Sequence, residues 1–221
     1  MSSIVRVWDL PTRVFHWALV ASIIGLVSTA QIGAEAMVWH FRFGYTVLSL
    51  LLFRFIWGVV GGRWSRFASF AYSPATAFRY LKGQRHPEHS IGHSPSGAVS
   101  VFALLGFLLL QVATGLISDD EIATSGPLSK FASSVVVSAA TFYHGNVGKL
   151  ILLTLIVLHI GAVLFYLFNM GEDLIRPMIR GDKETLVVTT SSRDDVWSRL
   201  LAAAVFLSCA ALVAWMIQQA E

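Results

Sequence analysis

The sequence has a single cysteine and very few charged side chains. Asp, Glu, Lys and Arg make up 13% of its 221 residues, and the one thiol is that of Cys209. A single cysteine excludes an intramolecular disulfide and a paired-thiol redox motif. The formal net charge of +3 belongs to short loops between apolar runs, so it gives no reason to expect a nucleic-acid partner.

Hydrophobic residues are correspondingly abundant, at 55% of the chain, and the mean hydropathy is +0.66. This composition is typical of an integral membrane protein that contacts lipid. Apolar runs of about spanning length cover residues 14–34, 43–60, 97–117, 147–168 and 200–217. None of them alternates as barrel strands do, so we expect an all-α integral membrane fold.

The first four runs are expected to form a four-helix transmembrane bundle, and the fifth run a further C-terminal transmembrane helix. This predicts a first domain over residues 1–180, followed at 181–221 by a cytoplasmic linker and the last helix. We expect the first run to be a retained helix, because it is too long for a signal peptide. Residues 118–143 are expected to be an outer loop with a short amphipathic surface segment.

The charged residues predict an orientation. Acidic side chains follow the third run at Asp119, Asp120 and Glu121, whereas basic side chains dominate the amino-terminal segment and the loops after the second and fourth runs. The positive-inside bias therefore places the amino terminus in the cytoplasm and, after five spans, the carboxyl terminus in the periplasm.

Four histidines lie in or beside these apolar runs. His144 precedes the fourth run and His159 lies within it, fifteen positions further on, so a helix would separate them by about 22 Å and place one near each edge of a hydrocarbon layer about 30 Å thick. His16 begins the first run, on the cytoplasmic side, and His40 precedes the second, on the outer side. Depth therefore pairs His16 with His159 and His40 with His144.

Two imidazoles from two helices at one depth are what a six-coordinate b-type haem needs as axial ligands. The pattern thus predicts two non-covalent haems, since no Cys-x-x-Cys-His run is present for covalent attachment. The other ring nitrogen of each ligand should find a carbonyl or hydroxyl partner. Gly44 and Gly148 each lie four residues after a histidine, where a missing side chain leaves room for a porphyrin.

Basic residues near each level are candidates to pair with haem propionates. Arg13 and Arg54 lie at the inner level, and Arg42 and Lys149 at the outer level. Arg54 has a second interpretation, as a side chain that snorkels to the headgroups.

The remaining histidines belong to a polar loop. His86 and His89 are expected to be solvated. His93 is expected to bond a propionate, to line a quinone pocket or merely to end the loop, and Arg85 and Glu88 are further candidates for an inner-face quinone site.

The order of these motifs resembles a known family. Arg13-Val-Phe-His16-Trp17, the Gly92-His93-Ser-Pro-Ser-Gly97 segment and the other three histidines in sequence are similar to the bacterial cytochrome b561 family, over about residues 7–180. This family includes the cytochrome b subunits of nickel-iron hydrogenases. The resemblance implies two b haems held by His16 with His159 and by His40 with His144. It also implies electron transfer with membrane quinone.

These observations predict a di-haem b-type cytochrome of the bacterial inner membrane that relays electrons between the quinone pool and a periplasmic redox partner, such as a cytochrome c or another redox subunit. In the family that the chain resembles, a fifth helix is found in the hydrogenase-type subunits and is missing from the shortest members, so the resemblance favours an electron-transfer subunit of a respiratory complex over a stand-alone enzyme. An alternative is a membrane oxidoreductase that acts alone on a diffusible species such as superoxide, with quinone as second substrate. A haem-free anchor or transporter is a third, although the chain lacks the paired broken helices of transporters.

Overall fold

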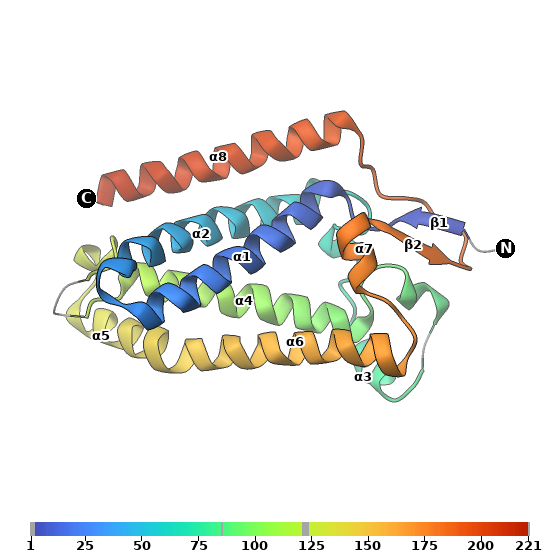
Figure 1. Cartoon of the computed structure of the whole chain (residues 1–221), viewed down its shortest axis with the longest axis horizontal. Coiled ribbons are helices and arrows are strands. Elements are labelled where there is room, and N and C mark those ends of the chain that lie inside the picture. Colours follow the sequence, from blue (N-terminus) through green and yellow to red (C-terminus); the bar gives the residue numbers. More distant parts are fainter. Residues whose placement is uncertain (1–2, 85, 121–123, 221) are drawn as a thin grey trace. The chain divides into compact units, whose positions relative to one another are not determined.

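The computed structural model describes residues 3–84, 86–120 and 124–220. Five helical segments in it are long and apolar enough to cross a membrane, which confirms the predicted all-α membrane fold. They are α1 (Leu10–Ile32), α2 (Met37–Val60), α4 (Pro95–Ile117), the run that ends in α6 (Lys149–Asn169), and α8 (Val196–Ala220) (Figure 1).

The first two helices begin earlier than the apolar runs predict. The Asp9 side chain accepts a hydrogen bond from the backbone N–H of Thr12 and so caps α1 at Leu10. The link to α2 is one turn, η1 (Ala34–Ala36), entered through Gly33 at φ 67°. As a result, His40 lies inside α2 and not before it. The sequence pattern missed this part of the helix because its first residues are polar and aromatic and carry too little hydrophobicity to be recognised as part of a span.

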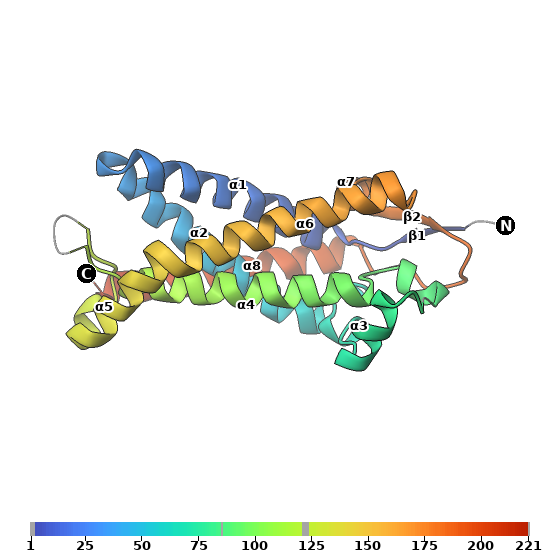
Figure 2. The same ribbon diagram turned by 90° about the horizontal axis from the view of Figure 1, so that it is seen from below.

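The segment before α6 is helical where a surface loop was expected. α5 (Ser134–Phe142) continues through η5 (Tyr143–Gly148), a π-helical turn, into α6 without a break (Figure 2). The expectation that residues 118–143 form only a loop with a surface segment is therefore wrong for its last part. Serine and β-branched residues lower helix propensity, but continuity with an existing helix removes the cost of nucleation.

Two short strands pair near the amino terminus, and the sequence patterns did not predict them. β1 (Ser3–Arg6) is antiparallel to β2 (Asp182–Thr185), with Ser3 opposite Thr185 and Arg6 opposite Asp182 (Figure 1). The remaining short elements are η2 (Phe67–Ser69), α3 (Pro74–Leu81), η3 (Pro87–Ser90), η4 (Ser129–Phe131) and α7 (Ile175–Arg180). The predicted linker is thus partly ordered by β2, and α7 directly precedes it.

Contacts divide the chain into two compact units. The first unit comprises residues 1–16, 54–103 and 157–205, and the second comprises 17–53, 104–156 and 206–221. Val5, Val7, Trp8 and Ile91 form a buried cluster in the first. In the second, α8 packs on α2 through Phe53 and Phe206, whose ring centroids are 6.2 Å apart. The predicted boundary at residue 180 stays a prediction.

Apolar side chains cover much of the outer surface of the spans. Large exposed hydrophobic residues on α6 include Val157, Leu158 and Phe168, and on α8 they include Leu207 and Trp215. In a water-soluble protein such surfaces would drive aggregation, whereas in a membrane they face hydrocarbon chains. The chain is therefore in contact with lipid.

Candidate metal centres

The second unit brings His40 and His144 together. The two ring centroids lie 6.2 Å apart, and the ring planes are crossed at 87°. Two bonds of about 2 Å from nitrogen to a shared metal ion, plus the distance from each nitrogen to its ring centre, give a centroid separation of about 6 Å. The pair therefore has the spacing of two axial ligands on one iron.

Hydrogen bonds fix the tautomer of both rings in this pair. His40 Nδ1 lies 3.0 Å from the carbonyl oxygen of Leu26, and His144 Nδ1 lies 2.9 Å from that of Gln111. A carbonyl oxygen only accepts, so each Nδ1 carries the hydrogen and donates it. Nε2 is then the nitrogen with a lone pair available for a metal, and the carbonyl bond raises the basicity of the ligand.

α4 contributes no histidine to this pair but holds His144 closely. Besides accepting from the ring, Gln111 donates from Nε2 to the backbone oxygen of His144 at 2.9 Å. A Cβ atom added at Gly115 would lie 2.6 Å from Cε1 of the same ring, so only glycine leaves the imidazole its place. His144 itself lies in the π-helical turn η5, a distortion that is frequent at functional sites.

The two glycines predicted to accommodate a porphyrin have different surroundings. A Cβ atom at Gly44 would meet nothing within 4 Å, so open space lies beside it. At Gly148 it would clash with Gln111 Oε1 and with the Tyr143 ring. Gly44 therefore lies where a flat ligand has room, whereas Gly148 lets α4 and η5 approach each other.

The first unit contains His16 and His159. Both side chains are half-buried, and the two rings are close enough to interact electrostatically. His16 is held near the start of α1 and His159 in the middle of α6. Two half-buried imidazoles from two helices again provide a pair of donors suited to iron.

Two further basic side chains are buried close to His159. Arg54 is 3% exposed and lies over the Phe67 ring at 4.5 Å, so it does not snorkel. Its NH1 atom is buried and has no hydrogen-bond partner among the described residues. His93 packs against Trp8 and Phe70, with ring centroids 4.7 and 4.3 Å away.

His93 interacts electrostatically with both Arg54 and His159. Its Nδ1 atom is buried and has no hydrogen-bond partner in the described part of the chain. Burial lowers the pKa of His93 to about 3, so this ring is neutral at pH 7. An anionic group would satisfy the unpaired guanidinium N–H of Arg54, and a ligand oxygen would satisfy Nδ1 of the neutral imidazole, which donates or accepts according to its tautomer.

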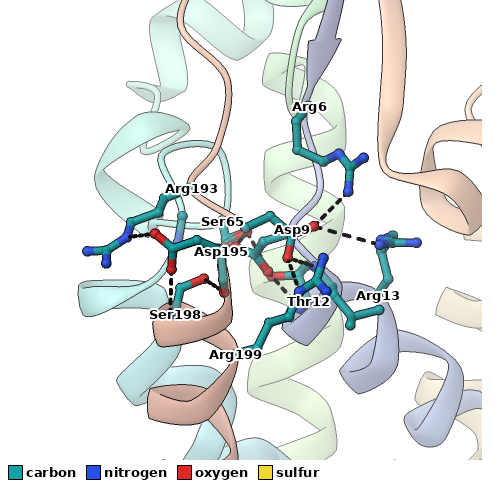
Figure 3. A network of polar contacts seen from close by, with 12 residues as sticks. Arg6, Asp9, Thr12, Arg13, Ser65, Arg193, Asp195, Ser198 and Arg199 are labelled. Carbon is teal, nitrogen blue, oxygen red and sulfur yellow. Dashed lines mark hydrogen bonds and ion pairs between the residues drawn. The ribbon is translucent and has the colours of Figure 1, made fainter.

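Asp9 organises the buried polar contacts of the first unit (Figure 3). It is fully buried, and besides capping α1 it accepts hydrogen bonds from Trp57 Nε1, Gly62 N and Ser65 Oγ. Asp9 also attracts Arg54 electrostatically, so the carboxylate compensates part of that buried charge. No sequence pattern indicated this role of Asp9, because these hydrogen-bond donors lie 48 to 56 residues further along the chain.

Arg13 has protein partners of its own. It donates to the carbonyl oxygen of Ile179 at 2.6 Å and lies 3.9 Å from Asp194. Arg6 and Arg199 also donate to Asp194. Arg54 is therefore better placed than Arg13 to receive an anionic ligand.

Charge pairing outside the spans shifts the pKa values of Arg6 and Asp194. The hydrogen bond to Asp182 raises the pKa of Arg6. Burial alone would raise the pKa of Asp194, but its bonds from Arg199, Leu10 N and Arg6 lower it below its usual value.

The other candidate residues have different surroundings. Arg42 stacks on the Trp39 ring at 4.7 Å, whereas Lys149 has an exposed side chain and interacts electrostatically with His144. His86 and His89 line a polar cavity of about 150 Å³ with Thr76, Arg79 and Gln84. Arg85 and Glu121 lie outside the described residues, and the side chain of Glu88 is likewise not described.

The described residues hold no cluster of three or more His, Cys, Asp or Glu side chains arranged to bind a metal ion. This fits centres with two protein ligands each, in which a porphyrin supplies the other four donors. Apolar spans that carry two pairs of histidines, one of them held by backbone carbonyl oxygens, fit a membrane cytochrome of the b type.

Comparison with known families identifies the group. The family model for prokaryotic cytochrome b561 matches residues 7–181, most of the chain, and the protein belongs to this family. Its members are bacterial membrane cytochromes that bind b-type haem and transfer electrons. Neither a search of curated proteins nor a search of solved structures gave a match.

Proposed function

We propose that the chain binds two b-type haems, one between His40 and His144 and one between His16 and His159, and relays electrons between membrane quinone and a periplasmic redox partner. The spacing of the first pair carries the proposal: rings 6.2 Å apart, both with Nδ1 directed at a carbonyl oxygen. Bound haem iron supplies the one-electron chemistry. The helical run from α5 to α6 provides one ligand of each pair.

The chain's own residues prepare each site for a haem. Neutral imidazoles cost little to bury and leave Nε2 free for iron. In the first unit, Arg54 would hold a haem propionate with its buried NH1 atom, because a carboxylate pairs well with a guanidinium. We assign the quinone to the same unit, where neutral His93 would hydrogen-bond a quinone oxygen. The predicted orientation, with the amino terminus in the cytoplasm, places this unit on the cytoplasmic side.

A dithionite-reduced minus oxidised spectrum of the purified chain, with haem quantified per polypeptide, tests the proposal. We expect a b-type spectrum and two haems per chain. His159→Ala should lower the count to one and leave the spectrum of the other haem in place, while His89→Ala, outside both pairs, should keep two. A chain that retains two haems after His159→Ala, or is colourless despite adequate haem supply, would refute the ligand assignment.

The relay itself needs a second measurement. In membranes from a strain that lacks other quinol oxidases, quinol should reduce both haems, and a periplasmic acceptor protein should reoxidise them. Rapid reoxidation of the isolated chain by superoxide or another small acceptor, with no protein partner, would instead favour a stand-alone oxidoreductase.

A further inference from the structure

α4 lies beside the His40–His144 pair without contributing a ligand, yet two of its residues contact His144. Gln111 makes two hydrogen bonds with this residue: its carbonyl oxygen accepts from Nδ1, and its side-chain Nε2 donates to the backbone oxygen, each at 2.9 Å. Gly115, one turn further along α4, leaves just enough space for the ring. We call Gln111 and Gly115 the α4 clamp.

We propose that the α4 clamp sets the rotation of the His144 imidazole and thereby the electronic structure of the haem in the second unit. Gln111 and Gly115 are positioning residues, since they act through His144. The inference rests on the proposed function only where it concerns a bound haem. The orientation and tautomer of the ring are properties of the chain itself.

The clamp holds the ring from three directions. The carbonyl of Gln111 fixes the position of Nδ1, and the amide of the same residue fixes the backbone from which the ring projects. The face toward α4 is closed, because even a methyl group at Gly115 would lie 2.6 Å from Cε1. A ring held by one hydrogen bond and a steric wall, on a backbone held by a second hydrogen bond, cannot rotate freely to suit the porphyrin, so the protein sets the angle.

That angle is nearly perpendicular to the other ligand. The planes of His40 and His144 cross at 87°. Crossed axial imidazoles leave two iron d orbitals close in energy, which gives low-spin ferric haem a strongly anisotropic electron paramagnetic resonance signal. Parallel imidazoles separate those orbitals and give a smaller anisotropy. Axial ligation and the hydrogen bonds around it are the means by which a protein adjusts a haem.

A first test needs no haem. In the haem-depleted chain, nitrogen-15 resonance of labelled histidine should show His144 with its hydrogen on Nδ1, whereas free histidine prefers Nε2. An ordinary Nε2–H tautomer at His144 would overturn the clamp, whatever the haem content of the native protein. Failure of the haem assignment alone would leave this result unchanged, so the two outcomes are distinguishable.

The second test uses the haem-loaded protein and two variants that disturb the clamp differently. Gln111→Met keeps the side-chain volume but removes the donor, and Gly115→Ala pushes on the ring. Both variants should either lower the largest g-value of the second-unit haem, which means a less anisotropic signal, or fail to bind that haem. The signal of the first-unit haem should be unchanged. Gly106→Ala is the matched control on the same helix, because an added Cβ there meets nothing within 4 Å. Two haems and an unshifted signal in both variants would refute the proposal.

Discussion

The two units use the same donor groups in different surroundings. In the second unit, each imidazole is fixed by a backbone carbonyl, the neutral side chains of Thr29 and Gln111 lie close by, and the charged Lys149 that acts on His144 is exposed. In the first unit, buried charges surround the pair: Arg54 interacts with Asp9 and with neutral His93. A protein can therefore adjust one site through ligand orientation and the other through electrostatics, although all four ligands are histidines.

Removing one ligand from each unit should give the largest effects and tests whether the units are independent. We expect His144→Ala to lose the second-unit haem and His159→Ala the first-unit haem, each halving the haem content. Each remaining haem should keep its own potential, because its ligands lie in the unaltered unit. The pyridine adduct and a redox titration measure both quantities. Loss of both haems from either variant would show that the sites are not separable.

Replacing Asp9 should destabilise the first unit strongly. Asp9→Ala leaves the buried donors of Trp57, Gly62 and Ser65 without their acceptor, at a cost of about 3 kcal/mol. Thermal unfolding in detergent should therefore begin earlier than in the parent, and hydrogen exchange should rise first in the first unit. Glu184→Gln, at an exposed carboxylate, is the control, and uniform exchange in both units would contradict the prediction.

Arg54→Gln should lower the midpoint potential of the first-unit haem. A buried cation disfavours the more positive ferric state, so removing it shifts the potential down by roughly 70 mV if the charge acts across about 10 Å at an effective dielectric constant near 20. The second-unit haem should hardly change. Arg66→Gln, an exposed residue of the same unit, controls for net charge. Equal shifts of both haems would mean that the electrostatic contrast between the units is incorrect.

The smallest expected effect is on the pH dependence of stability, through the ionisation of Asp194. Its pKa in the folded chain lies below the usual value, so the unfolded chain binds a proton first as the pH falls. The stabilisation by Asp194 is therefore complete above about pH 5 and is lost as the pH drops through about 4 and below. Asp194→Asn should have a lower melting temperature than the parent at pH 7, and this difference should shrink toward pH 3.5. A constant difference would exclude ionisation as the cause.

Patterns of hydrophobicity and histidine spacing were sufficient to predict the five spans and to select the four histidines. Such features are visible because a membrane requires long apolar runs and makes any polar residue within them conspicuous. The start of α2 was not predicted, because Trp39, His40 and Arg42 make its first two turns polar and aromatic. The pairing of the four histidines as haem ligands stays a prediction that the proposed variants test.

Contacts made by the backbone could not be predicted from the sequence. The carbonyl oxygens of Leu26 and Gln111 are present in any residue, so nothing in the sequence marks them as partners of His40 and His144. The burial of Arg54 depends on Phe67 and Asp9, which are distant along the chain. The role of Gly115 depends on the His144 ring, a neighbour that is known only once the helices are placed.

The pairing of β1 with β2 has a consequence for the order in which the chain is made. Arg6 is among the first residues to be synthesised, but its partners Asp182 and Asp194 follow about 180 residues later. At a synthesis rate of roughly 5–20 residues per second, β1 is made many seconds before β2. All four candidate histidines have been synthesised by residue 159, so they are all present before β1 can pair with β2. Cofactor insertion can therefore precede the pairing of β1 with β2, which joins the first and last segments of the first unit.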